Sequence, residues 1–382
     1  MNFIRIVTNT PESQKKYAAM YYKTEPFYSF NHNHTNNWEI KTAVEILCSL
    51  GYDVDLIDRG NKNWVPDKEY DIFLGLGVGN SGNQFVKYSK LSKAKKRVLL
   101  AMGPQPDISN KRVIKRYDMF NNRTKNNARA MRTVTDVIGE KFVDIIENTD
   151  FIFCIGEEGT KSFDSFSSYN KPVIGFYPGV SEKVIFKDDF LKTRKRRNFL
   201  CFAGNGLICK GVDLLVEGFL LDENKDKYLD ICGPSESSFV KEYRDKINKS
   251  SNITYHGFIN VESEKFVKLA STCAYVIFHP SSEGCCTSVA TAMKAGLVPI
   301  INSWTGINIE NNVNGFLMND HDDSDELIIK EISSTVKYAS SVSKVEYNEL
   351  LNNSLENSKK FSQKSFIESY TKALKEVIST RG

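Results

Sequence analysis

The sequence predicts an α/β fold with two domains, each built on a parallel sheet that helices cover on both faces. Short apolar runs alternate with helix-length amphipathic stretches over almost all of the 382 residues. About six of these runs fall in each half, and the rhythm breaks once, near residues 178–198. Such alternation is typical of parallel sheets, whereas a single barrel would need eight regular units. We therefore expect two Rossmann-like domains.

The composition excludes several classes of protein. Hydrophobic residues make up 41% of the chain and charged residues 26%, which fits a globular protein rather than a disordered or fibrous one. The net charge of +4 is too small to indicate a nucleic-acid partner. No apolar run reaches the roughly 18–20 residues that a membrane helix needs, and the opening MNFIRIV lacks the features of a signal peptide. We expect a cytoplasmic location.

The first half contains apolar runs of strand length. We expect a helix between the first two, because Ile40, Val44 and Leu47 recur at spacings of three and four residues and Gly51 supplies a stop. Asp53 and Asp55 alternate with an apolar position at the start of a strand, which indicates a structural role. The strands are expected at 3–7, 54–57, 71–76, 98–102, 151–155 and 172–176.

The second half repeats the pattern. Strands are expected at 198–203, 228–232, 252–256, 274–278, 298–301 and 315–318. Helices are expected at 211–221, 237–248, 262–271 and 285–296, and the tail SFIESYTKALKEVIST predicts a final amphipathic helix.

These elements divide the chain into an N-terminal domain at 1–180, a linker at 181–197, a C-terminal domain at 198–360 and a final helix at 361–382. Pro178 and Gly179 directly precede the linker, and the basic run Arg194–Arg197 ends it. We expect that basic run to be a solvated loop before a buried strand.

The cysteines and histidines do not form a recognisable metal or disulfide pattern. None of the eight cysteines belongs to a C-x-x-C pair, and most lie inside apolar runs, so we expect reduced, structural thiols. His32 and His34 would share one side of a strand, but no ligand spacing completes a site. We expect no metal and no required cofactor.

Basic residues are concentrated between Lys87 and Arg132, where fourteen Lys and Arg face two acids, Asp107 and Asp118. Two interpretations remain open. The stretch 87–132 attracts an anionic acceptor or the anionic inner face of a membrane, or it is an exposed basic surface without a partner. Its few aromatic residues argue against stacking on nucleic acid.

Two segments of the second half suggest a ligand site. NFLCFAGNGLICKGVDLLVEGF predicts a strand, a glycine-bearing loop and a helix, with Lys210 on the loop where a phosphate would be neutralised. AYVIFHPSSEGCCTSVATAMKAGLVPII predicts a buried strand, a polar loop that contains Glu283, and a helix. Together the lysine, the helix amides and the carboxylate suit a nucleotide-sugar, although Glu283 alone fits a helix cap equally well.

These segments, with HGFINVESEKFVKLASTCAYVIF between them, resemble the retaining glycosyltransferases of the GT-B fold. The resemblance is to the broad family 4 class of glycosyltransferase group 1, as found in bacteria, and it covers about 198–318. The first half resembles that class only in its strand–helix rhythm. The resemblance implies two Rossmann-like domains with a cleft between them and a C-terminal helix that returns to the first domain.

The resemblance also implies roles for matching positions. Lys210 would contact the donor β-phosphate and stabilise the leaving diphosphate, and Glu283 would hold hydroxyls of the transferred sugar. The remaining donor-binding positions, largely through backbone groups, would be Gly204, Asn205, Gly206, Gly233, Pro234, His256, Gly257, Phe258, Ile259, Gly284, Cys285, Cys286, Thr287 and Thr291.

The sequence departs from the family pattern at three places. Thr291 stands where a second glutamate is usual, which puts the ribose contact in doubt. Asn205 replaces an arginine of the first loop. FNHNHTNNWE replaces a glycine pair in the N-terminal domain, and it is either an acceptor-binding segment or a polar loop with an Asn cap before Trp38. On the acceptor side we expect His32, His34, Asn36, Asn37 and Arg123.

The function implied by the resemblance is transfer of a sugar from a nucleotide-diphosphate donor to a glycan or glycolipid acceptor, with retention of configuration and in surface polysaccharide synthesis. Two alternatives remain open: a non-catalytic protein of the same descent that binds sugar-nucleotides or glycans, and a nucleotide-sugar epimerase. The peripheral inner face of the membrane is a further expected location.

Overall fold

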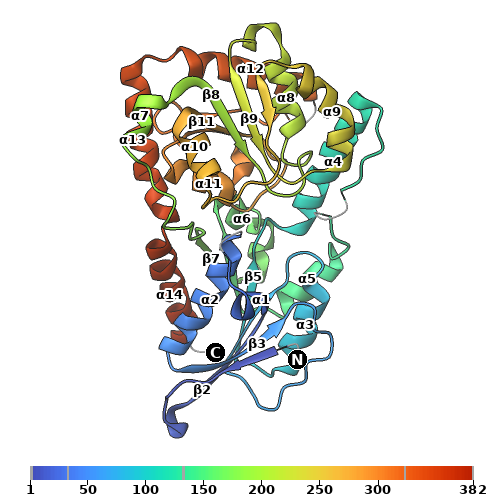
Figure 1. Cartoon of the computed structure of the whole chain (residues 1–382). Coiled ribbons are helices and arrows are strands. Elements are labelled where there is room, and N and C mark those ends of the chain that lie inside the picture. Colours follow the sequence, from blue (N-terminus) through green and yellow to red (C-terminus); the bar gives the residue numbers. More distant parts are fainter. Residues whose placement is uncertain (1–2, 32–33, 131–133, 322–323, 381–382) are drawn as a thin grey trace. The chain divides into compact units, whose positions relative to one another are not determined.

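The computed structural model describes residues 3–31, 34–130, 134–321 and 324–380 (Figure 1). The chain divides into two compact units. The first unit comprises Met1–Ile108, Val134–Gly179 and Gln363–Gly382, and the second comprises Ser109–Thr133 and Val180–Ser362. Each unit is built on its own sheet, which confirms the expected pair of Rossmann-like domains. Residues 109–133, which we expected in the N-terminal domain, belong to the second unit.

Seven of the described strands form the sheet of the first unit, in the order β1-β3-β2-β4-β5-β6-β7. All neighbours are parallel except β1 and β3, which are antiparallel. The strands are β1 (Phe3–Ile6), β2 (Lys16–Tyr22), β3 (Tyr52–Asp58), β4 (Ile72–Leu76), β5 (Lys96–Ala101), β6 (Phe151–Ile155) and β7 (Val173–Phe176).

Helices cover this sheet on both faces. Helices α3 (Gly82–Leu91) and α5 (Glu140–Glu147) bury Phe85, Phe142 and Ile145 against one face. On the other face, α14 (Gln363–Ser379) packs against α2 (Thr35–Ser49) and β7 (Figure 1). The short helices α1 (Glu25–Tyr28) and α6 (Glu157–Lys161) complete the unit. The final helix therefore packs on the first domain, as predicted.

The strand β2 was not predicted from the sequence. Its segment KYAAMYY has no alternation of apolar and polar residues, because β2 is an internal strand between β3 and β4 and residues 18–22 are buried on both faces of the sheet. The structural role of the two aspartates is confirmed. Asp53 accepts hydrogen bonds from the amide and hydroxyl of Thr8, and Asp55 forms an ion pair with Arg5.

The second unit contains a sheet of six described strands, all parallel, in the order β10-β9-β8-β11-β12-β13. Every strand lies where the apolar runs predicted one. The strands are β8 (Lys195–Phe202), β9 (Tyr228–Cys232), β10 (Ile253–Tyr255), β11 (Cys273–Phe278), β12 (Val298–Ile301) and β13 (Phe316–Leu317).

The four helices predicted for this half are confirmed as α8 (Val212–Leu220), α9 (Ser237–Lys249), α10 (Glu264–Thr272) and α11 (Thr287–Lys294). Two further helices were not predicted, α12 (Asp325–Ser341) and α13 (Lys344–Ser358). The long helix α4 (Pro106–Thr124) begins in the first unit and lies in the second from Ser109 onward.

The basic run at 194–197 is not the solvated loop that we expected. Helix α7 (Phe190–Thr193) precedes it, and β8 begins at Lys195. The Arg194 guanidinium donates hydrogen bonds to the carbonyls of Ala270 at 2.7 Å and Ala295 at 3.2 Å. Charge alone did not reveal this role, because the carbonyl partners come from distant helix ends.

The carboxyl group of Glu39 is buried in the first unit, and its titration can be tested. Glu39, on α2, is 4% exposed, and burial raises its pKa to about 8 from an ordinary 4.5, against smaller lowering effects of the Gly179 amide and Lys23. The tyrosines Tyr22 and Tyr370 face it. The carboxyl group is therefore neutral in the folded protein at pH 7.

We expect this group to make the first unit less stable as pH rises. Below pH 4.5 both folded and unfolded chains hold the proton; between 4.5 and 8 only the folded chain does, so the free energy of unfolding falls by up to about 1.4 kcal/mol per pH unit. Glu39→Gln should flatten this slope. Urea unfolding of both proteins from pH 5 to 8 measures it, and equal slopes would contradict the assignment.

Candidate functional site

Loops follow the carboxyl ends of five parallel strands of the second unit, and the first four of them carry the predicted donor-binding residues except Thr287 and Thr291, which lie on α11. Ligands of open α/β sheets bind at this edge. The loops are 203–211 after β8, 233–236 after β9, 256–259 after β10, 279–286 after β11 and 302–306 after β12.

The structure brings Lys210 and Glu283 into direct contact. The Lys210 ammonium donates a hydrogen bond to the Glu283 carboxylate, and the two side chains are 13% and 25% exposed. Burial is the largest single effect and lowers the pKa of Lys210, but the Glu283 charge, the hydrogen bond to Glu283 and the nearby Cys286 and Cys209 together outweigh it, so the pKa lies above its ordinary value and the lysine stays charged. The Phe278 ring lies 5.7 Å from the same ammonium.

Two glycines allow the Lys210 loop to reach this position. Gly206 and Gly211 have φ angles of +84° and +71°. A Cβ atom on Gly211 would lie 2.2 Å from the His279 carbonyl oxygen, so only glycine fits there. The neighbouring loop is joined directly, because the Ser281 amide and hydroxyl both donate to the Cys209 carbonyl at 2.8 and 2.9 Å.

The Glu283 loop is held by the short 3-10 turn at Ser303–Thr305. The Glu283 amide donates to the Trp304 carbonyl at 3.0 Å and the Cys286 amide to the Thr305 carbonyl at 2.8 Å. The Cys286 amide therefore already donates a hydrogen bond within the protein. This corrects the expectation that it would donate to the diphosphate of a bound nucleotide-sugar. A Cβ atom on Gly306 would lie 1.8 Å from the Gly284 carbonyl oxygen, so these two loops meet backbone to backbone.

The loops that follow β9 and β10 are joined through their backbones. The Gly233 amide donates to the Gly257 carbonyl at 2.9 Å. A side-chain contact joins the His256 ring to Asp230 at 2.6 Å, while Phe258 is 59% exposed and Ile259 is buried. Phe258 is therefore the aromatic side chain of this loop that is open to a base.

Thr291, which stands where a second glutamate is usual in the family, does not point into solvent. It is 5% exposed, and its hydroxyl donates to the Thr287 carbonyl one turn earlier in α11 at 2.7 Å. This is the usual back-bond of a helical threonine. Gly204 and Asn205, in the first loop, are exposed.

The residues expected on the acceptor side do not form one group. His32 lies outside the described residues. His34 is the N-cap of α2, where its Nδ1 accepts a hydrogen bond from the Asn36 amide, so histidine rather than asparagine provides the cap. Asn37 is buried between the Lys23 ammonium and Asn31.

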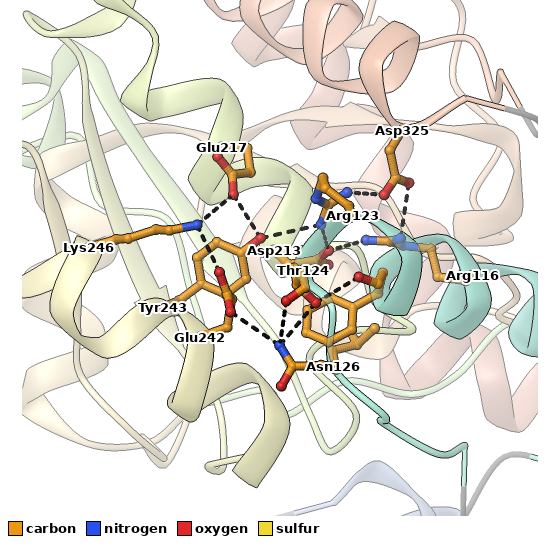
Figure 2. Close-up of polar contacts among 12 residues, drawn as sticks. Arg116, Arg123, Thr124, Asn126, Asp213, Glu217, Glu242, Tyr243, Lys246 and Asp325 are labelled. Carbon is orange, nitrogen blue, oxygen red and sulfur yellow. Dashed lines mark hydrogen bonds and ion pairs between the residues drawn. The ribbon is translucent and has the colours of Figure 1, made fainter.

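Arg123 belongs to the second unit and corrects the acceptor-side expectation. Together with Arg116 it faces Asp213 and Asp325, and each arginine contacts both carboxylates (Figure 2). Arg116 and Asp213 are nearly fully buried, with side chains 6% and 0% exposed. This cluster joins α4 to the first turns of α8 and α12.

The network continues from Arg123 to α9. The Tyr243 hydroxyl lies 3.3 Å from Arg123 and donates to Glu217 at 2.9 Å, and Lys246 contacts both Glu217 and Glu242 (Figure 2). The Asn126 amide donates to Glu242 at 3.1 Å. Charged and polar groups on α8, α9 and α12 therefore hold segment 109–130 to the rest of the second unit.

Sequence reasoning missed four side chains that surround the candidate site: Arg112, Arg116, Tyr117 and Glu236. Three of them lie on α4, whose sequence is far from the loops that they contact. The spacing of Arg112 and Arg116 by four residues was a signal that they share one helix face. Their burial and partners depend on tertiary packing, which no local pattern encodes.

The thiols are structural, as predicted. All eight cysteines are free and lie in the described part of the chain. Burial raises the pKa of Cys209 and Cys232 to about 12 and raises that of Cys286, so these thiols near the site remain protonated. A protonated thiol is a poor nucleophile.

Neither a metal-binding cluster nor a helix able to span a membrane occurs among the described residues. No group of three or more His, Cys, Asp or Glu side chains is arranged to hold a metal ion. None of the described helices combines the length and the apolar character needed to cross a bilayer.

At least seven of the described basic residues between 87 and 130 form ion pairs, which leaves less free positive charge than the sequence indicated. These are the pairs Lys90–Asp144, Lys93–Glu69, Lys95–Asp71, Arg97–Asp150, Arg112–Asp320, Arg116–Asp213 and Arg123–Asp325. The stretch is also divided between the two units.

Residues 185–349 match the family model described as Glycosyl transferases group 1. This range contains the five loops of the candidate site and begins after α4. No curated protein sequence matches the chain.

Solved structures resemble the chain at low identity. The pneumococcal O-GlcNAc transferase GtfA, in complex with UDP and GlcNAc, matches with a TM-score of 0.60 and 14% identity over 81% of this chain and 57% of that chain. Sucrose-phosphate synthase from Thermosynechococcus elongatus matches with 0.66 and 12% over 95% and 99%. WaaG, a glycosyltransferase involved in lipopolysaccharide biosynthesis, matches with 0.57 and 12% over 95% and 100%.

The likeness to these structures concerns the fold, and it confirms the expected GT-B architecture of two Rossmann-like domains. The chain spans little more than half the length of GtfA and nearly the full length of the other two.

Proposed function

We propose that the protein is a glycosyltransferase that uses a nucleotide-diphosphate sugar as donor. The observation that carries this proposal is the convergence of Lys210 and Glu283 at the carboxyl edge of a parallel sheet, inside the region that matches glycosyl transferases group 1. A cation suits the diphosphate, and a carboxylate suits sugar hydroxyls.

The ion pair defines what donor binding must do. The Lys210 ammonium and the Glu283 carboxylate pair with each other in the structure. A donor would separate them, with the Lys210 ammonium donating to the β-phosphate and Glu283 accepting from a hydroxyl of the sugar. Charge that develops on the departing diphosphate would then meet a cation already in place, which is the most effective form of electrostatic stabilisation.

We further propose that the sugar is transferred with retention of configuration, without a required metal, to a glycan or glycolipid acceptor. Support comes from the family resemblance and from the involvement of WaaG in lipopolysaccharide biosynthesis. The same proposal includes a role in surface polysaccharide synthesis. It also includes contact of residues 87–132 with the inner face of the membrane.

The test is a panel of UDP-, ADP- and GDP-linked sugars with and without mono- and oligosaccharide acceptors, in buffer with EDTA and with Mg²⁺. We expect one donor to release its nucleoside diphosphate, faster with an acceptor, and to form a product whose anomeric configuration NMR assigns as retained. Donor binding in a thermal-shift screen without any turnover would favour the non-catalytic alternative. Conversion of the donor to another nucleotide-sugar would favour an epimerase.

A further inference from the structure

We infer that residues 109–124 of α4, here called the bracket helix, set the distance between the two loops that carry Lys210 and Glu283, with Arg112 as a positioning residue for Glu283. The inference rests on the proposed function, because it assigns these loops to the donor. The bracket helix lies outside the region that matches glycosyl transferases group 1.

One end of the bracket helix holds the Glu283 loop. The Arg112 Nε donates to the Ser281 carbonyl at 2.6 Å, and the guanidinium carbon lies 3.9 Å from the centroid of the Trp304 ring. The Trp304 carbonyl in turn accepts the Glu283 amide at 3.0 Å. One turn earlier on the helix, the Ser109 and Ser282 hydroxyls are 3.1 Å apart. Arg112 therefore holds the backbone at Ser281 directly and the amide of Glu283 through Trp304.

The other contacts of the bracket helix hold the Lys210 loop. Arg116 contacts Asp213, which is three residues after Lys210 in the first turn of α8 (Figure 2). The Tyr117 hydroxyl donates to one oxygen of Glu236 at 2.8 Å, and the other oxygen accepts the Ile208 amide at 3.0 Å. The Lys210 loop is thus held both before and after the lysine.

The consequence follows from helix geometry. Arg112 and Arg116 are four residues apart, so they lie on one face about 6 Å apart along the axis. A rigid helix that grips both loops keeps Lys210 and Glu283 close enough to pair and limits how far a donor can separate them. A displacement of about 1 Å in such a site is enough to lower turnover by about 100-fold.

The test compares Arg112→Ala and Arg112→Lys with wild type and with Arg244→Ala, a matched control on the exposed face of α9. The readouts are hydrogen exchange of 281–286, the melting temperature, binding of UDP, ADP and GDP, and kcat and KM with the donor that the panel identifies. Arg112→Ala should speed exchange of 281–286 and lower kcat by about 10-fold to 100-fold. Nucleotide affinity should stay within about 2-fold, because Glu283 meets the sugar and not the nucleotide.

The lysine variant separates positioning from charge. Lysine keeps the cation but lacks the planar guanidinium that stacks on Trp304, so it should recover little activity. Unchanged exchange and kcat in Arg112→Ala, full rescue by lysine, or a parallel loss of nucleotide binding and melting temperature would each overturn the inference. If wild type transfers no sugar, the proposed function fails, while the exchange of 281–286 still decides whether Arg112 holds the loop.

Discussion

Lys210→Met is expected to lower kcat for sugar transfer by about 100-fold or more, which is the effect of removing a preorganised group from a developing anion. The expectation follows from the raised pKa of Lys210, which keeps the ammonium charged, and from its position 5.7 Å from the Phe278 ring in a partly buried site. Donor affinity should also fall, because the ground-state diphosphate is anionic. Steady-state kinetics with the donor from the panel measures both.

Glu283→Gln should give a loss of similar size, and the double variant should be little worse than either single one, because groups that act as a unit are not additive. The exchanged variant Lys210→Glu/Glu283→Lys separates structure from catalysis. It restores an ion pair, so stability should recover, while activity should not, since the cation now lies on the wrong loop. Lys241→Met, on the exposed side of α9, serves as the control. Wild-type rates in both single variants would remove this pair from the mechanism.

Arg116→Met is expected to lower the free energy of unfolding of the second unit by about 3–5 kcal/mol. The Asp213 side chain is fully buried and that of Asp325 is 9% exposed. Without Arg116, these two carboxylates of the cluster share one arginine, Arg123. Uncompensated buried carboxylates are costly because the interior cannot solvate them. Urea unfolding followed by circular dichroism, with hydrogen exchange of α8 and α12, measures the loss.

The matched comparison is Arg123→Met, whose side chain is 21% exposed and should therefore cost less. Adding Asp213→Asn to Arg116→Met should restore part of the stability, since it removes the unpaired charge. A change below about 0.5 kcal/mol in Arg116→Met, which is the usual size of a surface substitution, would show that the cluster does not hold α4.

Patterns in the sequence predicted the strands of the second unit well because each is a short apolar run, and amphipathic stretches after β8, β9, β10 and β11 predicted the helices α8 to α11. The first unit was harder. β2 reads as neither strand nor helix because both of its faces are buried, and β1 runs antiparallel to its neighbour although the alternation predicted a parallel sheet.

The residues of the candidate site were likewise predicted only in part. Lys210 and Glu283 were identified because each stands in a glycine-bearing or polar loop after a strand. The groups that hold those loops were not identified. Arg112 and Arg116 lie in a helix with many other charged residues, and only the tertiary structure shows that their charges are used inside the second unit rather than on a surface.

The position of α14 has a consequence for the order in which the chain can fold during synthesis. Residues 363–379 are synthesised after every other strand and helix of both units, yet they cover a face of the first sheet that includes Met20, Leu100 and Phe176. Until then that face stays open on the nascent chain. The second unit needs nothing beyond Ser362, so it can finish first, although its sequence begins later. The first unit is therefore the part of the chain whose apolar face stays exposed longest during synthesis.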